Sequence, residues 1–263
     1  MKNVKIFPDL DSLAHAVAEQ FLKLAVKAIA THGRCALSLA GGSTPRKIYS
    51  LLASEEFVKK IGWQFVHVFW GDERCVPPDH SDSNYRMARE TLLDHVPLPK
   101  DNIHRIRGEI EPAKAADDYE RRLLSFFYPR FRRKEIRTGE LLPRFDLVLL
   151  GIGQDGHTAS LFPDNSALDE KERLVTSVYA PPEITPRWRI TMTLPVLNNA
   201  SSVFFIVTGA HKRETVQAIL NDSKTSRKRY PAAMVRPKRG AVWWLDGDVA
   251  GSSGRERTKK RRL

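Results

Sequence analysis

The sequence predicts an α/β fold built on a mostly parallel, doubly wound sheet flanked by helices. Short apolar runs typical of buried strands alternate with longer segments whose apolar residues recur at helical spacing. Several of these runs end abruptly in glycine-rich polar loops, as strands of parallel sheets commonly do. The chain has 263 residues, of which 41% are hydrophobic. This is enough for a sizeable core, and we expect one α/β domain over residues 1–250.

The individual elements follow from apolar periodicity and from residues that can cap helices. In the first helix apolar residues recur on one face, and Asp11 or Ser12 can cap its start. For the second helix, Ser43 or Thr44 can supply the cap and Pro45 suits the first position. Strands are expected over residues 4–7, 35–40, 65–70, 147–150, 174–178, 190–194, 203–207 and 242–245. Helices are expected from about 12 to 30, around 48–52, over 85–93 and 113–127, and from about 212 to 220.

The formal net charge of +12 is concentrated in three segments rather than spread over the chain. Residues 130–144 hold six Arg or Lys against two Glu, residues 221–240 seven against one Asp, and residues 251–263 six against one Glu. The remaining body is therefore close to neutral. We interpret residues 129–144 as a basic insertion and residues 251–263 as a basic, disordered tail. The tail has the charge to contact nucleic acid, but a solvated terminus is the favoured interpretation.

Composition also indicates the compartment. No apolar run reaches the length of a membrane span, and the first residues lack the apolar core of a signal peptide. The two cysteines, Cys35 and Cys75, lie beside strand-like segments. Reduced thiols in a cytoplasmic protein are the simplest account of this usage, and no membrane partner is expected.

Four apolar strands end in polar loops, and in a parallel sheet such ends share one edge. The loops read GGSTPR after Ala40, GDER after Trp70, GIGQDGH after Leu150 and TGAHK after Val207. The Gly-Gly-Ser-Thr-Pro turn places free backbone N–H groups at a helix start, where an anion is favoured. The sequence therefore predicts a phosphate-binding site at this edge, formed by most of Ser43, Thr44, Arg46, Asp72, Arg74, Asp155, His157 and Lys212.

The loop within FDLVLLGIGQDGHTASLFP, residues 145–163, admits two interpretations. Its three glycines fit the G-x-G-x-x-G pattern of dinucleotide-binding folds. That pattern requires a helix directly after the last glycine, and Pro163 limits any helix here to about two turns. We therefore expect no nicotinamide cofactor. His157 is instead a candidate general base, and Asp155 could orient it or contact substrate. The eight histidines show no metal-ligand spacing, so we expect no metal either.

Together these segments resemble the 6-phosphogluconolactonases over nearly the whole chain. The resemblance rests on residues 37–49, 69–88, 145–163, 189–200 and 207–212. It implies the Rossmann-like fold shared with glucosamine-6-phosphate deaminases and ribose-5-phosphate isomerases. It also implies cofactor-free hydrolysis of 6-phosphoglucono-δ-lactone in the pentose phosphate pathway. Apart from the resemblance, we expect a monomer or weak dimer. By resemblance, His157 is the base that activates water and Asp155 assists it, and the sugar phosphate is bound by Gly42, Ser43, Thr44, Arg74, Arg189 and Lys212.

Two alternatives to the lactonase stay open. The related deaminases resemble GHIAFNEP where this chain has GHTASLFP, and their Glu partners the histidine. The absence of that Glu favours the lactonase. A non-catalytic protein that binds sugar phosphate or RNA through its basic segments is the other alternative. Neither basic segment falls within a motif, so both leave the activity prediction unchanged.

Overall fold

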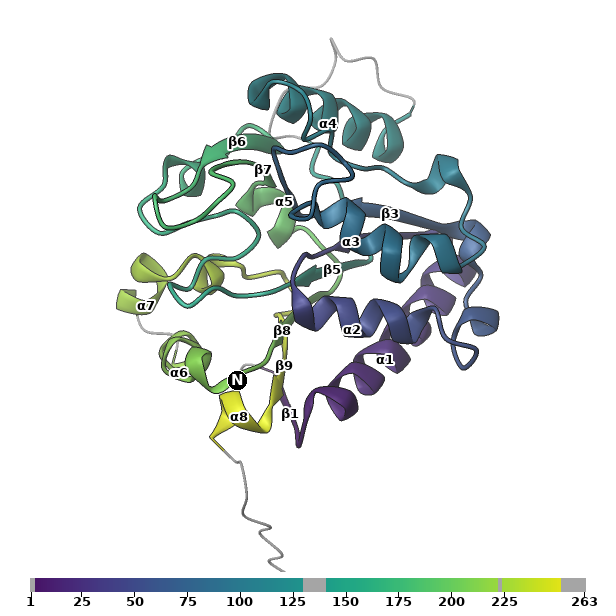
Figure 1. Cartoon of the computed structure of the whole chain (residues 1–263), viewed down its shortest axis with the longest axis horizontal. Helices are drawn as coiled ribbons and strands as arrows, with labels where there is room; N and C mark the ends of the chain where they lie inside the picture. Colours follow the sequence, from purple (N-terminus) through teal and green to yellow (C-terminus); the bar gives the residue numbers. More distant parts are fainter. Residues whose placement is uncertain (1–2, 130–140, 222–223, 252–263) are drawn as a thin grey trace, which may run out of the picture.

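The centre of the fold is a six-stranded parallel sheet in the strand order β1-β9-β8-β5-β2-β3. The computed structural model describes residues 3–129, 141–221 and 224–251. Every strand pair in this sheet is parallel, and helices flank it (Figure 1), so the predicted α/β architecture is confirmed. The strands are β1 (Asn3–Phe7), β2 (Cys35–Leu39), β3 (Val66–Trp70), β5 (Leu147–Leu150), β8 (Val203–Val207) and β9 (Val242–Asp246).

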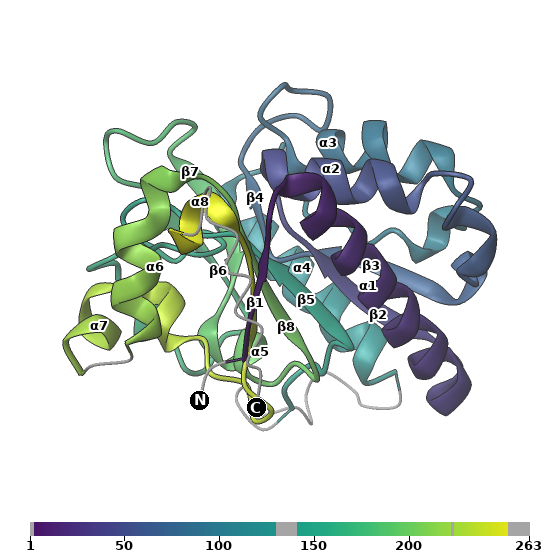
Figure 2. The same cartoon turned by 90° about the horizontal axis from the view of Figure 1, so that it is seen from below.

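Helices cover both faces of the sheet. Helices α1 and α2 contact each other on one face, and α4 lies behind the sheet when α1 is in front (Figure 2). On the α4 face, the hydroxyl of Tyr119 bonds to both backbone groups of Trp70 and the ring of Phe126 packs on Phe69. The helices are α1 (Leu10–His32), α2 (Ser43–Leu52), α3 (Asn84–Thr91), α4 (Pro112–Phe127), α5 (Leu194–Asn198), α6 (Arg213–Leu220), α7 (Lys224–Arg229) and α8 (Gly247–Ala250).

A second sheet of three antiparallel strands stands beside the first. Its order is β4 (Asp72–Arg74), β7 (Trp188–Met192) and β6 (Val175–Tyr179), and α4 packs against β6 and β7. The expectation that residues 72–74 form a loop is wrong. These residues are extended because they pair with β7, with Arg74 opposite Arg189. A three-residue strand is too short to show an apolar period.

Two predicted helix starts are also wrong. The first helix begins earlier than expected, because the carboxylate of Asp9, not of Asp11, accepts the N–H of Ser12 at 2.7 Å. The second helix already begins at Ser43, with Gly42 as its N-cap at φ 107°. Ser43 and Thr44 are therefore inside the helix, Pro45 is its third residue, and no side chain caps it.

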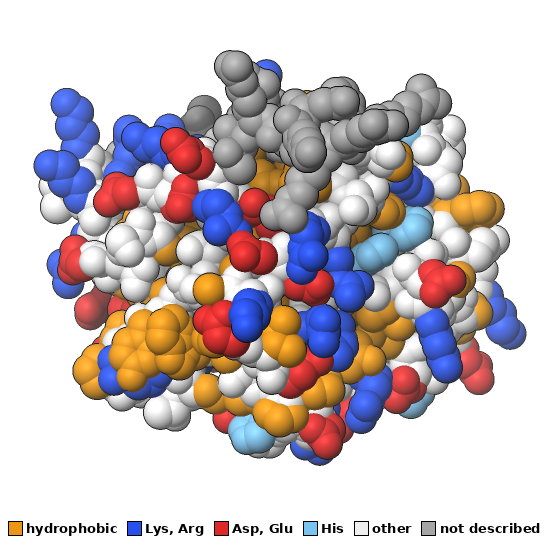
Figure 3. All heavy atoms as spheres, turned by 90° about the horizontal axis from the view of Figure 1, so that it is seen from above, with side chains coloured by type: hydrophobic (Ala, Val, Ile, Leu, Met, Phe, Trp, Pro, Cys, Tyr) orange, Lys and Arg blue, Asp and Glu red, His pale blue; other side chains and the backbone are white. Residues whose placement is uncertain are grey.

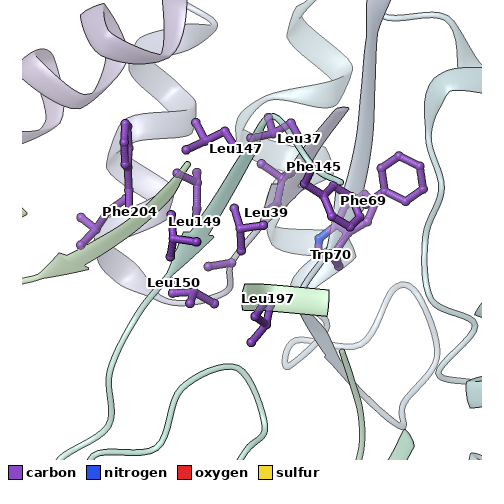
Figure 4. Packing of buried hydrophobic residues seen from close by; sticks show 14 of the residues in the cluster. Leu37, Leu39, Phe69, Trp70, Phe145, Leu147, Leu149, Leu150, Leu197 and Phe204 are labelled. Carbon is purple, nitrogen blue, oxygen red and sulfur yellow. The ribbon is translucent and has the colours of Figure 1, made fainter. Parts of the chain in front are cut away.

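The core lies along the middle strands of the parallel sheet (Figure 4). All residues of β2, β5 and β8 are buried, which explains why these strands are almost continuous apolar runs. Leu39, Leu149 and Leu150 lie near the strand ends that form the site, and the rings of Phe69 and Phe145 lie next to each other in the same cluster, with their centroids 5.3 Å apart. This packing fixes the strand ends from which the polar loops emerge.

The remaining expectations concern thiols, membranes and charge. Cys35 and Cys75 are both free thiols. In the described part of the chain, no helix combines the length and apolar character needed to cross a membrane. On the face shown in Figure 3, Lys and Arg side chains lie among Asp and Glu, which agrees with a body close to neutral. Most of the basic insertion, residues 130–140, and the tail from residue 252 lie outside the described residues.

Candidate active site

The loops after β2 and β5 leave the sheet where its winding direction reverses. Strand β2 has β3 on one side and β5 on the other. From β2 the chain order runs outward to β3 in one direction and through β5, β8 and β9 in the other, with β1 added at the β9 edge. Ligands of doubly wound sheets bind at such a switch point. A pocket of about 210 Å³ lies here. Its polar lining comes from Gly42, Ser43, Thr44, Asp72, Arg74, Asn84, His157, Thr158, Arg189 and Lys212.

The glycines after β5 make room for His157. The N–H of Gly153 donates to the carbonyl of His157 at 2.9 Å, and the N–H of Gly156 donates to the carbonyl of Gly153 at 3.1 Å. A Cβ on Gly153 would overlap the imidazole ring, and Gly156 has φ 81°, a left-handed conformation that favours glycine. No helix forms over residues 157–165, so the fingerprint glycines serve a compact turn that presents a histidine.

His157 and Asp155 form a hydrogen-bonded pair at the edge of the pocket. Nδ1 of His157 lies 2.6 Å from Oδ1 of Asp155, and the backbone N–H of His157 donates to the same oxygen at 3.1 Å. The imidazole also contacts the ring of Phe162 at a centroid distance of 4.8 Å. Burial acts to raise the pKa of Asp155, but the hydrogen bond and charge of His157 outweigh it and hold that pKa below its usual value.

The pair leaves one ring nitrogen of His157 for the pocket. Among the described residues, none forms a hydrogen bond with Nε2. Because Asp155 accepts a hydrogen bond from Nδ1–H, the neutral imidazole carries its lone pair on Nε2. This arrangement can remove a proton from a water molecule or hydroxyl in the pocket.

Two arginines from neighbouring antiparallel strands form a cationic wall of the pocket. Arg74 and Arg189 face each other in the β4–β7 register. Arg189 is 6% exposed, and its Nε donates to the carbonyl of Pro186 at 2.6 Å. Burial first, and then the charge of Arg74, lower the pKa of Arg189. Two adjacent guanidinium groups facing one cavity favour an anion between them.

Lys212 and the start of α2 extend this cationic character. Burial lowers the pKa of Lys212, against the effect of the nearby Asp246 carboxylate. Thr44 links α2 to the end of β8, because its Oγ1 lies 2.7 Å from Oγ1 of Thr208. The first N–H groups of a helix are not used within it, and α2 has no side-chain cap. The helix therefore presents N–H groups and the positive end of its dipole where an anion can bind.

Asp72 lies on the pocket wall and is held by two side chains that the sequence did not indicate. It is 8% exposed, and its Oδ2 accepts a hydrogen bond from the Ser160 hydroxyl at 2.6 Å. The amide of Asn84 donates to the Asp72 carbonyl at 3.0 Å. Asn84 belongs to α3 and not to a strand end, so the convergence of strand ends could not find it. The sequence feature that could have indicated Asn84 is the preceding Ser83, which caps the start of α3.

Most of the predicted residues meet at this pocket, and two do not line it. Asp155 lies behind His157 and reaches the pocket only through the imidazole. Arg46 is exposed, although it was expected in the site. Residues 44, 45, 48, 49 and 52 form the buried face of α2, and Arg46 is on the opposite face. In the described residues no group of three His, Cys, Asp or Glu side chains is placed to bind a metal ion.

Comparison with known proteins gives the family. The model of the family "Glucosamine-6-phosphate isomerases/6-phosphogluconolactonase" matches residues 8–244. The chain belongs to this family. A 6-phosphogluconolactonase of Nostoc sp. is 40% identical over 246 residues, which cover 93% of this chain and 95% of the relative. A 6-phosphogluconolactonase of Synechocystis sp. is 41% identical over 221 residues, or 84% of this chain and 85% of the relative.

Solved structures with the same fold support this comparison. The 6-phosphogluconolactonase from Trypanosoma cruzi has a TM-score of 0.82 and 28% identity, and 98% of each chain is covered. A monomeric glucosamine-6-phosphate deaminase has a TM-score of 0.77 at 17% identity, with 95% of this chain and 99% of that chain covered. The second likeness shows the shared fold alone. The Rossmann-like fold predicted from the sequence is thus the fold of this family.

Proposed function

We propose that this protein hydrolyses 6-phosphoglucono-δ-lactone to 6-phosphogluconate in the oxidative pentose phosphate pathway. The observation that carries the proposal is one pocket with His157, held by Asp155, on its rim and Arg74 and Arg189 on its wall. A phosphorylated lactone needs both parts, an anion site for its phosphate and a base for the water that attacks its carbonyl. The curated relatives named above carry this activity in their names.

The chemical step uses His157 as a positioned base and forms no covalent bond to the protein. Nε2 of His157 accepts a proton from water while the water oxygen bonds to C1 of the lactone. The C1–O5 bond then breaks, and the proton on Nε2 passes to O5, which leaves as the hydroxyl of the open chain. Asp155 keeps Nδ1 protonated and stabilises the imidazolium that forms in between. A general base of this kind contributes about 10²–10⁴-fold, which suits an activated ester.

The phosphate is the anchor of the substrate. Arg74, Arg189 and Lys212 supply positive charge, and the start of α2 at Gly42, Ser43 and Thr44 supplies N–H donors. Asp72 can accept hydrogen bonds from sugar hydroxyls, because the Ser160 hydroxyl, 2.6 Å from Oδ2, and the Asn84 amide, 3.4 Å from Oδ1, already fix the orientation of its carboxylate. These interactions hold the lactone carbonyl near His157, and such positioning supplies part of the rate enhancement.

The deaminase alternative is less well supported. Residues 158–163, TASLFP, contain no carboxylate that could partner His157 in ring opening of an amino sugar. The deaminase among the structural neighbours is 17% identical, against 40% for the Nostoc relative. We also infer that residues 1–250 form one catalytic unit that works in the cytoplasm as a monomer or weak dimer, and that the basic tail takes no part in catalysis.

The test compares the two substrates directly. Purified protein is mixed with freshly prepared 6-phosphoglucono-δ-lactone, and acid release is followed against the spontaneous rate. Glucosamine 6-phosphate is assayed in parallel by release of ammonium. The proposal predicts acid release well above the spontaneous rate and no ammonium. Ammonium release without lactone hydrolysis would favour the deaminase instead.

A further inference from the structure

Glu73 is a buried carboxylate between two residues of the pocket, yet it does not line the pocket. Asp72 and Arg74 precede and follow it in β4, and side chains alternate between the faces of a strand. Glu73 is 2% exposed and lies on the face of β4 turned away from the pocket. A buried carboxylate is costly unless hydrogen bonds compensate it, so its partners indicate what it does.

Four donors surround this carboxylate. Oε1 accepts the N–H of Arg74 at 2.8 Å and the N–H of Asn84 at 2.8 Å. Oε2 accepts the N–H of Tyr85 at 2.8 Å and the hydroxyl of Ser83 at 3.1 Å. Residues 83–85 are the cap and the first turn of α3. One side chain of β4 therefore fastens the start of α3 to the strand that carries Arg74.

Residues 82–85, three of which Glu73 binds, orient two polar side chains of the pocket, those of Arg74 and Asn84. The guanidinium of Arg74 donates from Nη1 to the carbonyl of Asp82 at 2.5 Å, one residue before Ser83. The side chain of Asn84 donates to Asp72, and it fills the space where a Cβ on Gly41 would lie. The orientation of Arg74 thus depends on a carbonyl whose position is set by the segment that Glu73 binds.

We propose that Glu73 is a positioning residue for the phosphate end of the active site, which it controls through Arg74 and Asn84. The inference rests on the proposed lactonase function and makes it more specific. Glu73 touches no substrate atom. It fixes residues 82–85 on β4, so that the Arg74 guanidinium is oriented before the phosphate arrives. Such preorganisation lowers the cost of binding and affects affinity for the phosphate more than the chemical step.

The chain contains a matched control for this idea. Glu120 on α4 is also a mostly buried carboxylate bonded to backbone N–H groups, those of Leu174 and Val175 at 2.9 and 3.2 Å. It also accepts Nε of Arg173 at 2.9 Å. These bonds fasten α4 near the start of β6, and Glu120 does not line the pocket. Loss of either carboxylate should weaken the fold, but only loss of Glu73 should alter phosphate binding.

The experiment compares wild type with Glu73→Gln and Glu120→Gln on two lactones, with and without the 6-phosphate. A glutamine at position 73 turns an N–H₂ group toward donors whose hydrogen bonds the Glu73 carboxylate oxygens accept. We expect Glu73→Gln to raise KM for the phosphorylated lactone by about 5- to 20-fold with kcat changed less than about threefold. For glucono-δ-lactone, which lacks the phosphate, kcat/KM should be unchanged. Glu120→Gln should lower Tm and leave both KM values as they are.

KM does not depend on the fraction of folded protein, so the KM of a less stable variant can still be compared with that of the wild type. If Glu73→Gln does not yield folded protein, Ser83→Ala removes one donor to Glu73 and should raise the same KM by about two- to threefold. An unchanged KM for the phosphorylated lactone in the folded variant overturns the inference, as does an equal loss on both lactones. Failure of the wild-type protein to hydrolyse the lactone would instead contradict the proposed function.

Discussion

Oδ1 of Asp155 accepts both Nδ1–H and the backbone N–H of His157, at 2.6 and 3.1 Å. A single carboxylate oxygen therefore fixes the ring and the backbone of the same histidine. The bond selects the tautomer with a free lone pair on Nε2, which is the nitrogen left for the pocket. It also places a negative charge where the imidazolium of the proposed reaction forms.

Substitution of this carboxylate tests its role. Asp155→Asn should lower kcat by about 10- to 100-fold, because an amide can present its N–H₂ group to Nδ1 and favour the wrong tautomer. KM should change little, since the phosphate site is intact. Asp164→Asn is the control, because Asp164 is exposed and makes no hydrogen bond in the described structure. If the two variants have the same kcat, Asp155 does not orient the base.

Arg189 should govern affinity for the phosphate. Its Nε donates to the Pro186 carbonyl and its Nη2 to the Thr185 carbonyl, so Nη1 is left for the pocket. A lysine cannot make both interactions, and Arg189→Lys should raise KM by about tenfold with a smaller effect on kcat. Arg46→Gln, on the outer face of α2, should leave KM within about twofold. Steady-state kinetics with the phosphorylated lactone give KM for both variants. A larger rise in KM for Arg46→Gln than for Arg189→Lys would contradict the assignment of this pocket as the phosphate site.

Gly153 should tolerate no side chain. A Cβ at this position overlaps the imidazole of His157. Gly153→Ala should therefore displace the base and lower kcat by about 10-fold or more. Gly62→Ala introduces a Cβ that makes only ordinary contacts with Phe65 and Ile29, and it should keep full activity. Full activity of Gly153→Ala would mean that the ring position seen here is not required.

A part-buried pair of histidines, His67 and His104, should make stability depend on pH. Burial first, and then the charges of His67 and Arg122, lower the pKa of His104 to about 4. Its imidazole stacks on Phe69 at 4.3 Å and lies 3.3 Å from Nδ1 of His67, whose pKa burial and Arg34 also lower. The unfolded chain, with an ordinary histidine pKa near 6.5, binds more protons below that pH. Stability is therefore complete above about pH 6.5 and is lost as the pH falls toward about 4.

The measurement for this prediction is the free energy of unfolding at several pH values. Between about pH 7 and about pH 4.5 the wild type should lose about 1–2 kcal/mol more than His104→Phe, because both imidazoles are part-exposed and water screens their charge. His211→Gln, at an exposed position, should behave like the wild type. Identical pH profiles for His104→Phe and the wild type would rule out this source of acid sensitivity.

The sequence predicted those parts of the fold that local pattern determines. Buried parallel strands are continuous apolar runs, so β5 and β8 and the loops after them could be located. The ends of parallel strands share one edge, and this rule was sufficient to place His157 and Lys212 near the turn that begins α2. The same rule placed Ser43, Thr44, Asp72 and Arg74 there, whereas other residues of the pocket depend on tertiary contacts that carry no local pattern.

Arg189 and Asn84 illustrate those contacts. Arg189 reaches the pocket because β7 pairs antiparallel with a three-residue strand, and only the family resemblance had indicated it. Asn84 reaches it because the buried carboxylate of Glu73 fastens α3. Arg46 was misplaced since its direction depends on the residue at which α2 begins, and helix boundaries are the least certain part of a sequence-based prediction.

The decisive comparison is the rate of hydrolysis of 6-phosphoglucono-δ-lactone by the wild type and by His157→Ala. The measurement is kcat after subtraction of spontaneous hydrolysis, with thermal unfolding as a check that the variant is folded. We expect kcat to fall by about 10²–10⁴-fold while the phosphorylated product, 6-phosphogluconate, still binds with wild-type affinity. A folded His157→Ala variant with the kcat of the wild type would contradict the proposed role of His157 as the base.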